Sequence, residues 1–387
     1  MRIALVLLLA AFSSYAEKTN RPEPPITLPR PVAAPPRVLT PSWEVPVPGT
    51  AVPMVTGMET SFAVATREGR ITGHRLDSGE RLWENDLATP LFSPPLFIEG
   101  QLVVVIAATP SPVLVFLDPL TGLASRRVPV PDGEKLTLTG VTGGLALTGL
   151  FSGSPGVRLY SVSGGALLWE SRLDAAASAP VSQCGQVILS GAADGMITAL
   201  SATDGSRLWT EKLPGPITTS VVCNGSRAWV GSADNHIHSL RMGRRSCRRR
   251  WSYSTGGDIA GRINLFNQQV SFLSYDTYLY SLAADNGHLQ WKVRLGRRPQ
   301  TDSVIVGATL VLAQLNTERL EFFSLTDGGQ TASLSLTAGG ERFVTPPARA
   351  GSMVVIGAAR YGEESSRIMG IAPLSEPPAP TGISAPR

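Results

Sequence analysis

The stretch MITALSATDGSRLW, residues 196–209, decides the fold of this 387-residue chain. An alternating segment, MITAL, leads into a short polar turn closed by Gly205, and Trp209 follows four residues later. Similar phrases end at Trp83, Trp169 and Trp291, each time four residues after a glycine. Recurrence of this kind indicates a repeat architecture, in which each unit buries its apolar face only against its neighbours.

The tryptophans, or the residues in their place, recur at steps of 40 to 43 residues. Their positions are Trp43, Trp83, Arg126, Trp169, Trp209, Trp251, Trp291 and about Ser333. One unit, 179–213, divides into four short strand-like segments separated by turns. Four-stranded units of this length are typical of β-propeller blades.

The two ends of the repeat region predict one shared blade. Three strand-like segments, 342–351, 352–359 and 367–372, have no tryptophan strand after them, whereas SWEVPVPG (42–49) is a tryptophan strand with no such segments before it. We therefore predict an all-β, eight-bladed β-propeller of four-stranded antiparallel blades over residues 41–374, closed by the N-terminal strand in the last blade. The tryptophans should pack across into neighbouring blades, which makes Trp43, Trp83, Trp169, Trp209, Trp251 and Trp291 structural docking residues.

The N-terminus predicts export. Arg2, the apolar run 3–12 and the small residues around Ala16 form a signal peptide over 1–16. No cysteine follows directly, so we expect the protein to be periplasmic or associated with the outer membrane without lipidation, and we predict no transmembrane span. Residues 17–40 are predicted to be a proline-rich disordered leader, either a spacer or a ligand for a proline-recognising partner, and 375–387 a disordered tail.

Positive charge is concentrated in one stretch, RMGRRSCRRRW (241–251), although the net charge is only +4. Its arginines are Arg241, Arg244, Arg245, Arg248, Arg249 and Arg250. Guanidinium groups donate forked hydrogen bonds to phosphate or carboxylate. We predict a loop in the fifth blade that either binds an anionic surface, such as lipopolysaccharide, anionic lipid or an acidic protein patch, or is simply solvated. No aromatic residues alternate with the arginines, so we predict no nucleic-acid partner.

Three cysteines leave at least one thiol unpaired. A Cys223–Cys247 disulfide would fix the arginine loop within one blade, a Cys184–Cys223 disulfide would join two blades, and three free thiols are the third possibility.

Histidine and aspartate residues give no complete metal site. His236 and His238 share one face of a strand, as a packed or exposed pair or as the start of a metal site that lacks a third ligand. Asp194, Asp234 and Asp276 occupy matching turns, where turn hydrogen bonds are favoured over a shared cation site. No nucleophile motif, phosphate-cradling glycine loop or paired carboxylates are found, so no catalytic, cofactor or metal residues are predicted.

The phrases MITALSATDGSRLW and YLYSLAADNGHLQW (278–291) resemble the tryptophan-docking repeat of PQQ-like, or quinoprotein-like, propellers. The resemblance covers most of residues 41–373. One branch, the quinoprotein dehydrogenases, needs an adjacent cysteine pair and calcium ligands, and this chain has no adjacent cysteines. Residues 169–200 are similar to the other branch, the BamB-like propellers of outer-membrane protein assembly.

The second branch implies a non-catalytic, cofactor-free, monomeric scaffold whose partners are envelope proteins, with an outer-membrane barrel insertase as the candidate. A PQQ-dependent dehydrogenase and a glycan- or anionic-lipid-binding propeller are the alternatives. The sequence departs from this family where the family contacts the barrel subunit. The loop AAASAP (175–180) is shortened, and Gly215 and Ile217 replace an acidic pair. The family's contact residues are therefore not transferred to this chain.

Overall fold

The computed structural model describes residues 35–48, 54–299, 302–313, 316–337, 339–360 and 365–372. The chain divides into Met1–Pro35 and Pro36–Arg387, and every described element belongs to the second unit. The predicted signal peptide, most of the predicted leader and the predicted C-terminal tail lie outside the described residues. The described residues form strands and turns without any helix, so none of them could cross a membrane as a helix.

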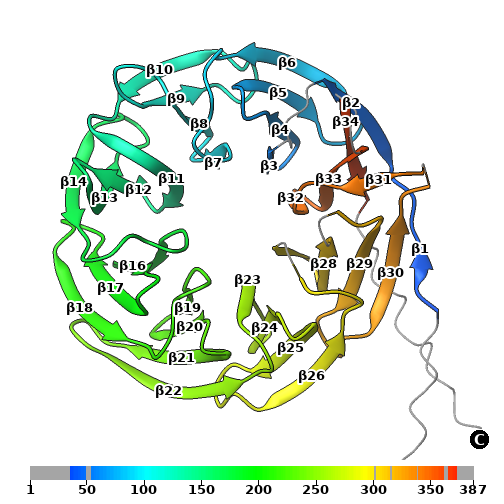
Figure 1. Ribbon diagram of the computed structural model, residues 1–387. Helices are drawn as coiled ribbons and strands as arrows, with labels where there is room; N and C mark the ends of the chain where they lie inside the picture. Colours follow the sequence, from blue (N-terminus) through cyan, green and yellow to red (C-terminus); the bar gives the residue numbers. More distant parts are fainter. Residues whose placement is uncertain are drawn as a thin grey trace, which may run out of the picture. The chain divides into compact units, whose positions relative to one another are not determined.

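Eight antiparallel sheets stand around a central axis in chain order, which confirms the predicted eight-bladed propeller (Figure 1). Blades 1 to 4 consist of β3 (Met54–Gly57), β4 (Ser61–Ala65), β5 (Arg70–Arg75) and β6 (Arg81–Asp86); β7 (Leu96–Ile98), β8 (Gln101–Ile106), β9 (Val113–Leu117) and β10 (Ala124–Pro129); β11 (Gly133–Val141), β12 (Gly144–Phe151), β13 (Ser154–Tyr160) and β14 (Leu167–Arg172); and β15 (Ser182–Cys184), β16 (Val187–Gly191), β17 (Met196–Ser201) and β18 (Arg207–Lys212). Blades 5 to 7 consist of β19 (Val222–Asn224), β20 (Arg227–Gly231), β21 (His236–Met242) and β22 (Cys247–Ser254); β23 (Ile259–Phe266), β24 (Gln269–Ser274), β25 (Tyr278–Ala283) and β26 (Leu289–Arg294); and β27 (Ser303–Val306), β28 (Thr309–Ala313), β29 (Arg319–Ser324) and β30 (Gln330–Ser335). In each blade the first strand lies nearest the axis and the fourth is outermost (Figure 1).

The eighth blade is built from both ends of the propeller, as predicted. It contains β31 (Glu341–Phe343) and β32 (Ala348–Ala350), which both pair with β33 (Met353–Arg360), followed by β34 (Ser365–Ile371) and β2 (Trp43–Pro48). β2 pairs antiparallel with β34, with Trp43 opposite Gly370. The ring is thus closed by a strand that precedes blade 1 in the sequence.

The core is divided among the spaces between blades. Eight clusters of buried apolar side chains are found in the described residues, one between each pair of neighbouring blades. One cluster packs Trp43 and Val355 of blade 8 against Phe62 of blade 1 and so seals the ring. Because both faces of a blade are covered, the second and third strands are nearly continuous apolar runs, such as LVVVI in β8.

Most indoles dock on the next blade through the glycine turn that the repeat predicts. Trp169 Nε1 donates to the Ala202 carbonyl at 3.1 Å, and its ring lies against Gly205. The φ of Gly205 is +71°, the left-handed conformation that this tight turn requires. Arg126 fills the tryptophan position of blade 2 in the same manner, because its guanidinium donates to the Val162 carbonyl at 3.1 Å. The equivalent donors of the other docks are Trp43, Trp83, Trp251 and Trp291.

A β-bulge precedes the docking position in blades 1 to 7 and sets its register. The unpaired residues are Leu82, Ser125, Leu168, Leu208, Arg250, Gln290 and Thr331. In blade 7 this register puts Ala332, and not Ser333, at the docking position.

A short additional strand covers the outside of blade 7. β1 (Arg37–Val38) pairs parallel with β30, and the Leu39 N–H donates to the Ser333 carbonyl at 2.8 Å (Figure 1). The last residues of the predicted leader therefore join a sheet, although proline-rich sequence favours solvated chain, because the segment 37–39 contains no proline and its backbone groups are free to pair.

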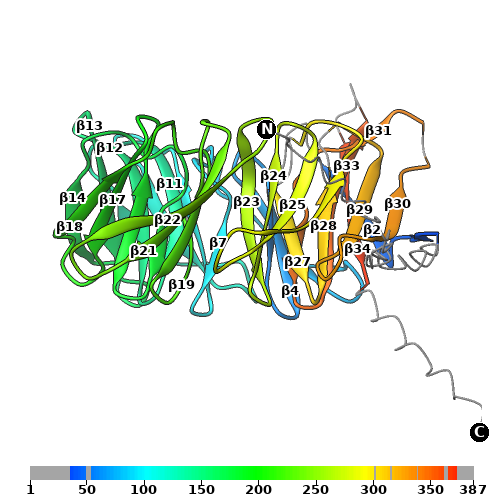
Figure 2. The same ribbon diagram turned by 90° about the horizontal axis from the view of Figure 1, so that it is seen from below.

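Antiparallel strands place the connections of each blade on two opposite rims (Figure 2). The linker rim carries the blade-to-blade loops together with the turns between second and third strands. The hairpin rim carries the turns between first and second strands and those between third and fourth strands.

Candidate functional site

The loops of the linker rim in blades 4 and 5 are tied to the sheets behind them. Ser178 donates from its backbone N to the Gly191 carbonyl at 2.9 Å and from Oγ to the Ile217 carbonyl at 2.7 Å. In blade 5, the Gly231 N–H donates to Thr219 Oγ1 at 2.9 Å. These bonds fix the backbone of both loops and make this part of the rim a preorganised surface.

The positions where this chain departs from the BamB-like pattern have structural roles here. Ile217 is 2% exposed and lies in the cluster between blades 4 and 5. Gly215 has no space for a side chain, because a Cβ there would lie 2.8 Å from the Asp234 backbone nitrogen. Neither position can present the acidic group that the family resemblance would place there.

The three predicted turn aspartates cap their own turns. The Oδ1 atoms of Asp194, Asp234 and Asp276 accept the backbone N–H two residues later, at 2.9, 3.0 and 3.1 Å. Their Oδ2 atoms contact different groups, which include Lys212 for Asp194 and Tyr280 for Asp276. Within the described residues no three His, Cys, Asp or Glu side chains are grouped so that they could hold a metal ion.

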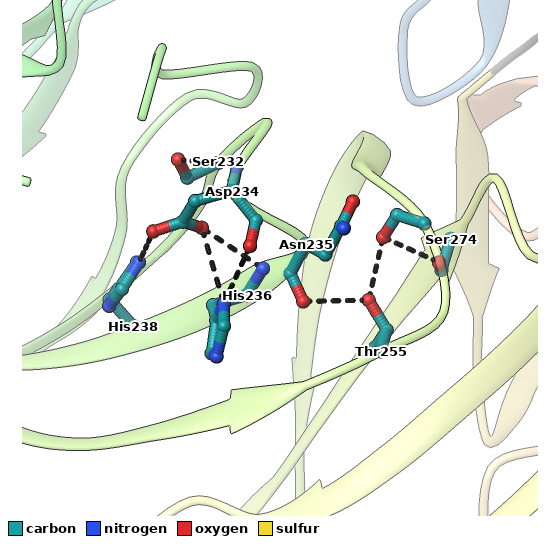
Figure 3. A network of polar contacts seen from close by, with 8 residues as sticks. Ser232, Asp234, Asn235, His236, His238, Thr255 and Ser274 are labelled. Carbon is teal, nitrogen blue, oxygen red and sulfur yellow. Dashed lines mark hydrogen bonds and ion pairs between the residues drawn. The ribbon is translucent and has the colours of Figure 1, made fainter. Parts of the chain in front are cut away.

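The two predicted histidines both turn to Asp234 (Figure 3). His238 Nε2 lies 2.9 Å from Asp234 Oδ2, and His236 Nδ1 lies 2.7 Å from the Asp234 carbonyl oxygen. The rings stack with centroids 5.7 Å apart. One nitrogen of each ring therefore contacts the Asp234 turn. The histidine pair is part of a polar network and does not form an open metal site.

His238 is held neutral in this network. The residue is 2% exposed, and burial lowers the pKa of its imidazole although the Asp234 carboxylate acts in the opposite direction. Its Nδ1 has no hydrogen-bond partner in the described structure, so a second proton would be buried without an acceptor. The neutral ring donates from Nε2 to Asp234 and fixes the turn.

The same network joins blade 5 to blade 6 (Figure 3). The Asn235 carbonyl accepts from Thr255 N at 2.8 Å and from Thr255 Oγ1 at 3.0 Å. Thr255 Oγ1 and Ser274 Oγ both contact the Gly257 carbonyl oxygen, at 2.7 and 3.0 Å. Hydrogen bonds therefore connect the loops of the linker rim from blade 4 to blade 6.

The predicted arginine loop is largely a strand extension on the hairpin rim. Arg241 belongs to β21, Arg248, Arg249 and Arg250 belong to β22, and only Arg244 and Arg245 lie in the turn. The prediction of a loop was wrong because Met242 pairs with Cys247, which continues the ladder almost to the tip. All six side chains are exposed.

The disulfide joins two blades. Cys184 and Cys223, in the first strands of blades 4 and 5, are bonded, and their Cα atoms are 5.9 Å apart. The Cys223–Cys247 pairing is therefore wrong, because Cys247 begins the outermost strand of blade 5 while Cys223 lies in the innermost one. Cys247 is a half-buried thiol, and burial raises its pKa to about 12.

Two features of this region are not evident from the repeat pattern: Arg227 and the altered environment of Trp209. Arg227 on β20 lies directly opposite Arg241. Strand register could have revealed this neighbour.

Trp209 Nε1 has no partner in the described structure, and its ring packs with Met242 and Cys247 where other blades present a glycine turn. Cys247 stands where the repeat has its turn glycine, four residues before Trp251, and this replacement is the sequence feature that indicates the change.

Comparison with known families supports the propeller type. Residues 127–241 match the model of a family described as outer membrane protein assembly factor BamB. A comparison with curated proteins found no match.

Solved structures share the fold at low sequence identity. BamB from Moraxella catarrhalis is 15% identical, with a TM-score of 0.66 over 86% of this chain and 97% of that chain. The computationally designed Ika8 protein is 13% identical, with a TM-score of 0.66 over 85% and 99%. The C-terminal WD40 domain of Sif2 is 10% identical, with a TM-score of 0.67 over 87% and 99%.

Proposed function

We propose that this PQQ-like propeller of the BamB type is a non-catalytic, exported scaffold that binds envelope proteins, with outer-membrane protein assembly as its process. The observation that carries the proposal is the family match over residues 127–241, which spans blades 3 and 4 and much of blade 5. The loops 175–180 and 214–219 of the linker rim lie within this segment.

The linker rim of blades 4 and 5 suits protein binding. Its loops are held by hydrogen bonds to the sheets, so little conformational freedom would be lost when a partner binds. Ala176, Pro180 and Pro216 are exposed on it. We assign the partner-binding surface to these loops. The residues that contact the partner there would differ from the contact residues of the BamB-like family.

A quinone-dependent dehydrogenase is the alternative, and the residues present do not fit it. That chemistry would need adjacent cysteines above the quinone, whereas the two bonded cysteines are 39 residues apart and join different blades. The turn aspartates are engaged by their own turns. Absorbance and calcium analysis of the purified protein test this alternative, because a scaffold should carry neither quinone nor calcium.

The disulfide supports the export part of the proposal. Structural disulfides persist in oxidising compartments such as the periplasm and are rare in the cytosol. The predicted signal peptide itself lies outside the described residues.

Site-specific photocrosslinking in cells tests the surface assignment. A photoreactive amino acid in place of exposed Ala176, on the linker rim, should yield an adduct with an outer-membrane barrel insertase. The matched control carries the same amino acid in place of Thr203, which is exposed on the hairpin rim of blade 4. Adducts from the Thr203 position alone, or no adduct from either position, would contradict the assignment.

A further inference from the structure

Three arginines form a row across blade 5. Arg227 on β20 pairs with Arg241 on β21, and Arg241 pairs with Arg248 on β22. Residues that are directly opposite each other in antiparallel strands project from the same face of the sheet. Like charges in such positions repel, so this row costs stability unless an anion neutralises it.

A pocket of about 280 Å³ lies beside this row, between blade 5 and the third-to-fourth-strand turn of blade 6. It is lined by Ser226, Arg227, Ser239, Arg241, Arg250 and Asp285. Arg250 reaches it from the bulge of β22, at the position that is occupied by Leu82 in blade 1 and by Leu168 in blade 3. The bulge therefore adds a third guanidinium to two that already share a sheet face.

Within the described structure these arginines have no ion-pair partner. Arg227 donates to the neutral side chain of Gln268 at 3.3 Å. In the described structure no carboxylate oxygen lies within 4.0 Å of the guanidinium nitrogens of the three pocket arginines, Arg227, Arg241 and Arg250. Several arginines of other blades form ion pairs within the ring, for example Arg158 with Glu170 at 2.9 Å and Arg207 with Asp174 at 2.8 Å. Blade 5 thus holds a concave cluster of charge that the protein itself does not balance.

We propose that this blade 5–6 arginine pocket binds a phosphate group. Phosphate accepts forked hydrogen bonds from several guanidinium groups at once, and it carries more negative charge than a single carboxylate. The hydroxyls of Ser226 and Ser239 supply further polar groups in the pocket wall. The lone carboxylate, Asp285, leaves a net positive lining. This inference is independent of the proposed scaffold function, which uses the opposite rim.

The phosphate can come from a free phosphate ester or from a lipid headgroup, and two probes distinguish these sources. Calorimetric titration with inorganic pyrophosphate measures the pocket alone. Sedimentation with phosphatidylcholine vesicles, with and without phosphatidylglycerol, measures headgroup binding. Saturable pyrophosphate binding without vesicle binding identifies a free ester, whereas binding to the phosphatidylglycerol vesicles with competition by pyrophosphate identifies a headgroup.

The pocket variant is Arg227→Gln/Arg241→Gln/Arg250→Gln. Its matched control, Arg127→Gln/Arg172→Gln/Arg294→Gln, removes the same charge from exposed positions on the outermost strands of blades 2, 3 and 6. We expect the pocket variant to bind at least about tenfold more weakly than the wild type, while the control changes little. A second variant with lysine at the three pocket positions keeps the charge but loses the forks, and should bind with intermediate affinity.

Pyrophosphate should also raise the melting temperature of the wild-type protein, a measurement that needs no variant. The proposal is overturned if the wild type binds neither probe, if the pocket variant binds as tightly as the wild type, or if the control variant loses binding to the same extent.

Discussion

Opening the Cys184–Cys223 disulfide should destabilise the propeller by several kcal/mol. The bond closes a loop between residues 39 apart, and it links the first strand of blade 4 to the first strand of blade 5. In the chain-entropy model, a cross-link over a loop of this length lowers the entropy of the unfolded chain by an amount worth about 4 kcal/mol at 25 °C. This is a large part of the roughly 5–15 kcal/mol that stabilises an ordinary domain.

Urea unfolding of the Cys184→Ala/Cys223→Ala variant, followed by tryptophan fluorescence, measures this effect. The unfolding midpoint should fall well below that of the wild type. Cys247→Ala provides the matched control, because it removes a thiol that is bonded to no other cysteine. Alkylation after denaturation without reductant should label one cysteine in the wild-type protein, since the other two are bonded.

Two results would refute this reasoning. Labelling of all three cysteines in protein isolated from the envelope would show that the bond does not form. A midpoint in the double variant equal to that of the Cys247→Ala control would show that the bond forms but does not restrain the chain.

Two further predictions concern the docking indoles and the buried histidines. Trp169→Phe should destabilise more than Trp209→Phe, by about 1 kcal/mol, because Trp169 donates to the Ala202 carbonyl whereas Trp209 Nε1 has no described partner; equal urea midpoints would contradict this. Burial lowers the pKa of both His74 and His238, so the unfolded chain takes up protons near its ordinary histidine pKa while the folded chain does not. This contribution to the free energy of unfolding should therefore be fully present above about pH 6.5 and decrease on acidification, by at most about 1.4 kcal/mol per pH unit for each histidine. In urea unfolding at several pH values, the free energy of unfolding of the His74→Gln/His238→Gln variant should depend less on pH than that of the wild type.

Periodicity made most of the fold predictable from sequence. Because a blade cannot bury its apolar faces alone, the same sequence pattern recurs in neighbouring blades. The spacing of tryptophan and glycine identified these units. Ring closure followed from counting strands at the two ends, and Trp43 opposite Gly370 confirms it. Position 126 shows that the docking role does not require tryptophan, because Arg126 donates to a backbone carbonyl of the next blade as tryptophan does in other blades.

Features that depend on pairing between distant segments could not be predicted in the same way. The choice among cysteine pairings depends on how close two strand ends lie in neighbouring blades, and spacing alone left it open. The Arg227–Arg241 pairing required the strand register, because 14 positions separate the two residues in the sequence. β1 pairs with blade 7 through backbone groups, whose partners no side-chain pattern specifies.

The unusual features of blades 4 and 5 account for one another. Blade 5 replaces the glycine turn with the arginine hairpin, and Trp209 of blade 4 then loses the hydrogen bond that its counterparts make. The interface between these two blades is also the one that carries the disulfide. Sequences usually keep local rules unless a function requires otherwise, and the resulting loss of stability is then offset elsewhere. The disulfide restrains the interface that the hairpin weakens, which supports a functional role for the arginines over a merely solvated turn.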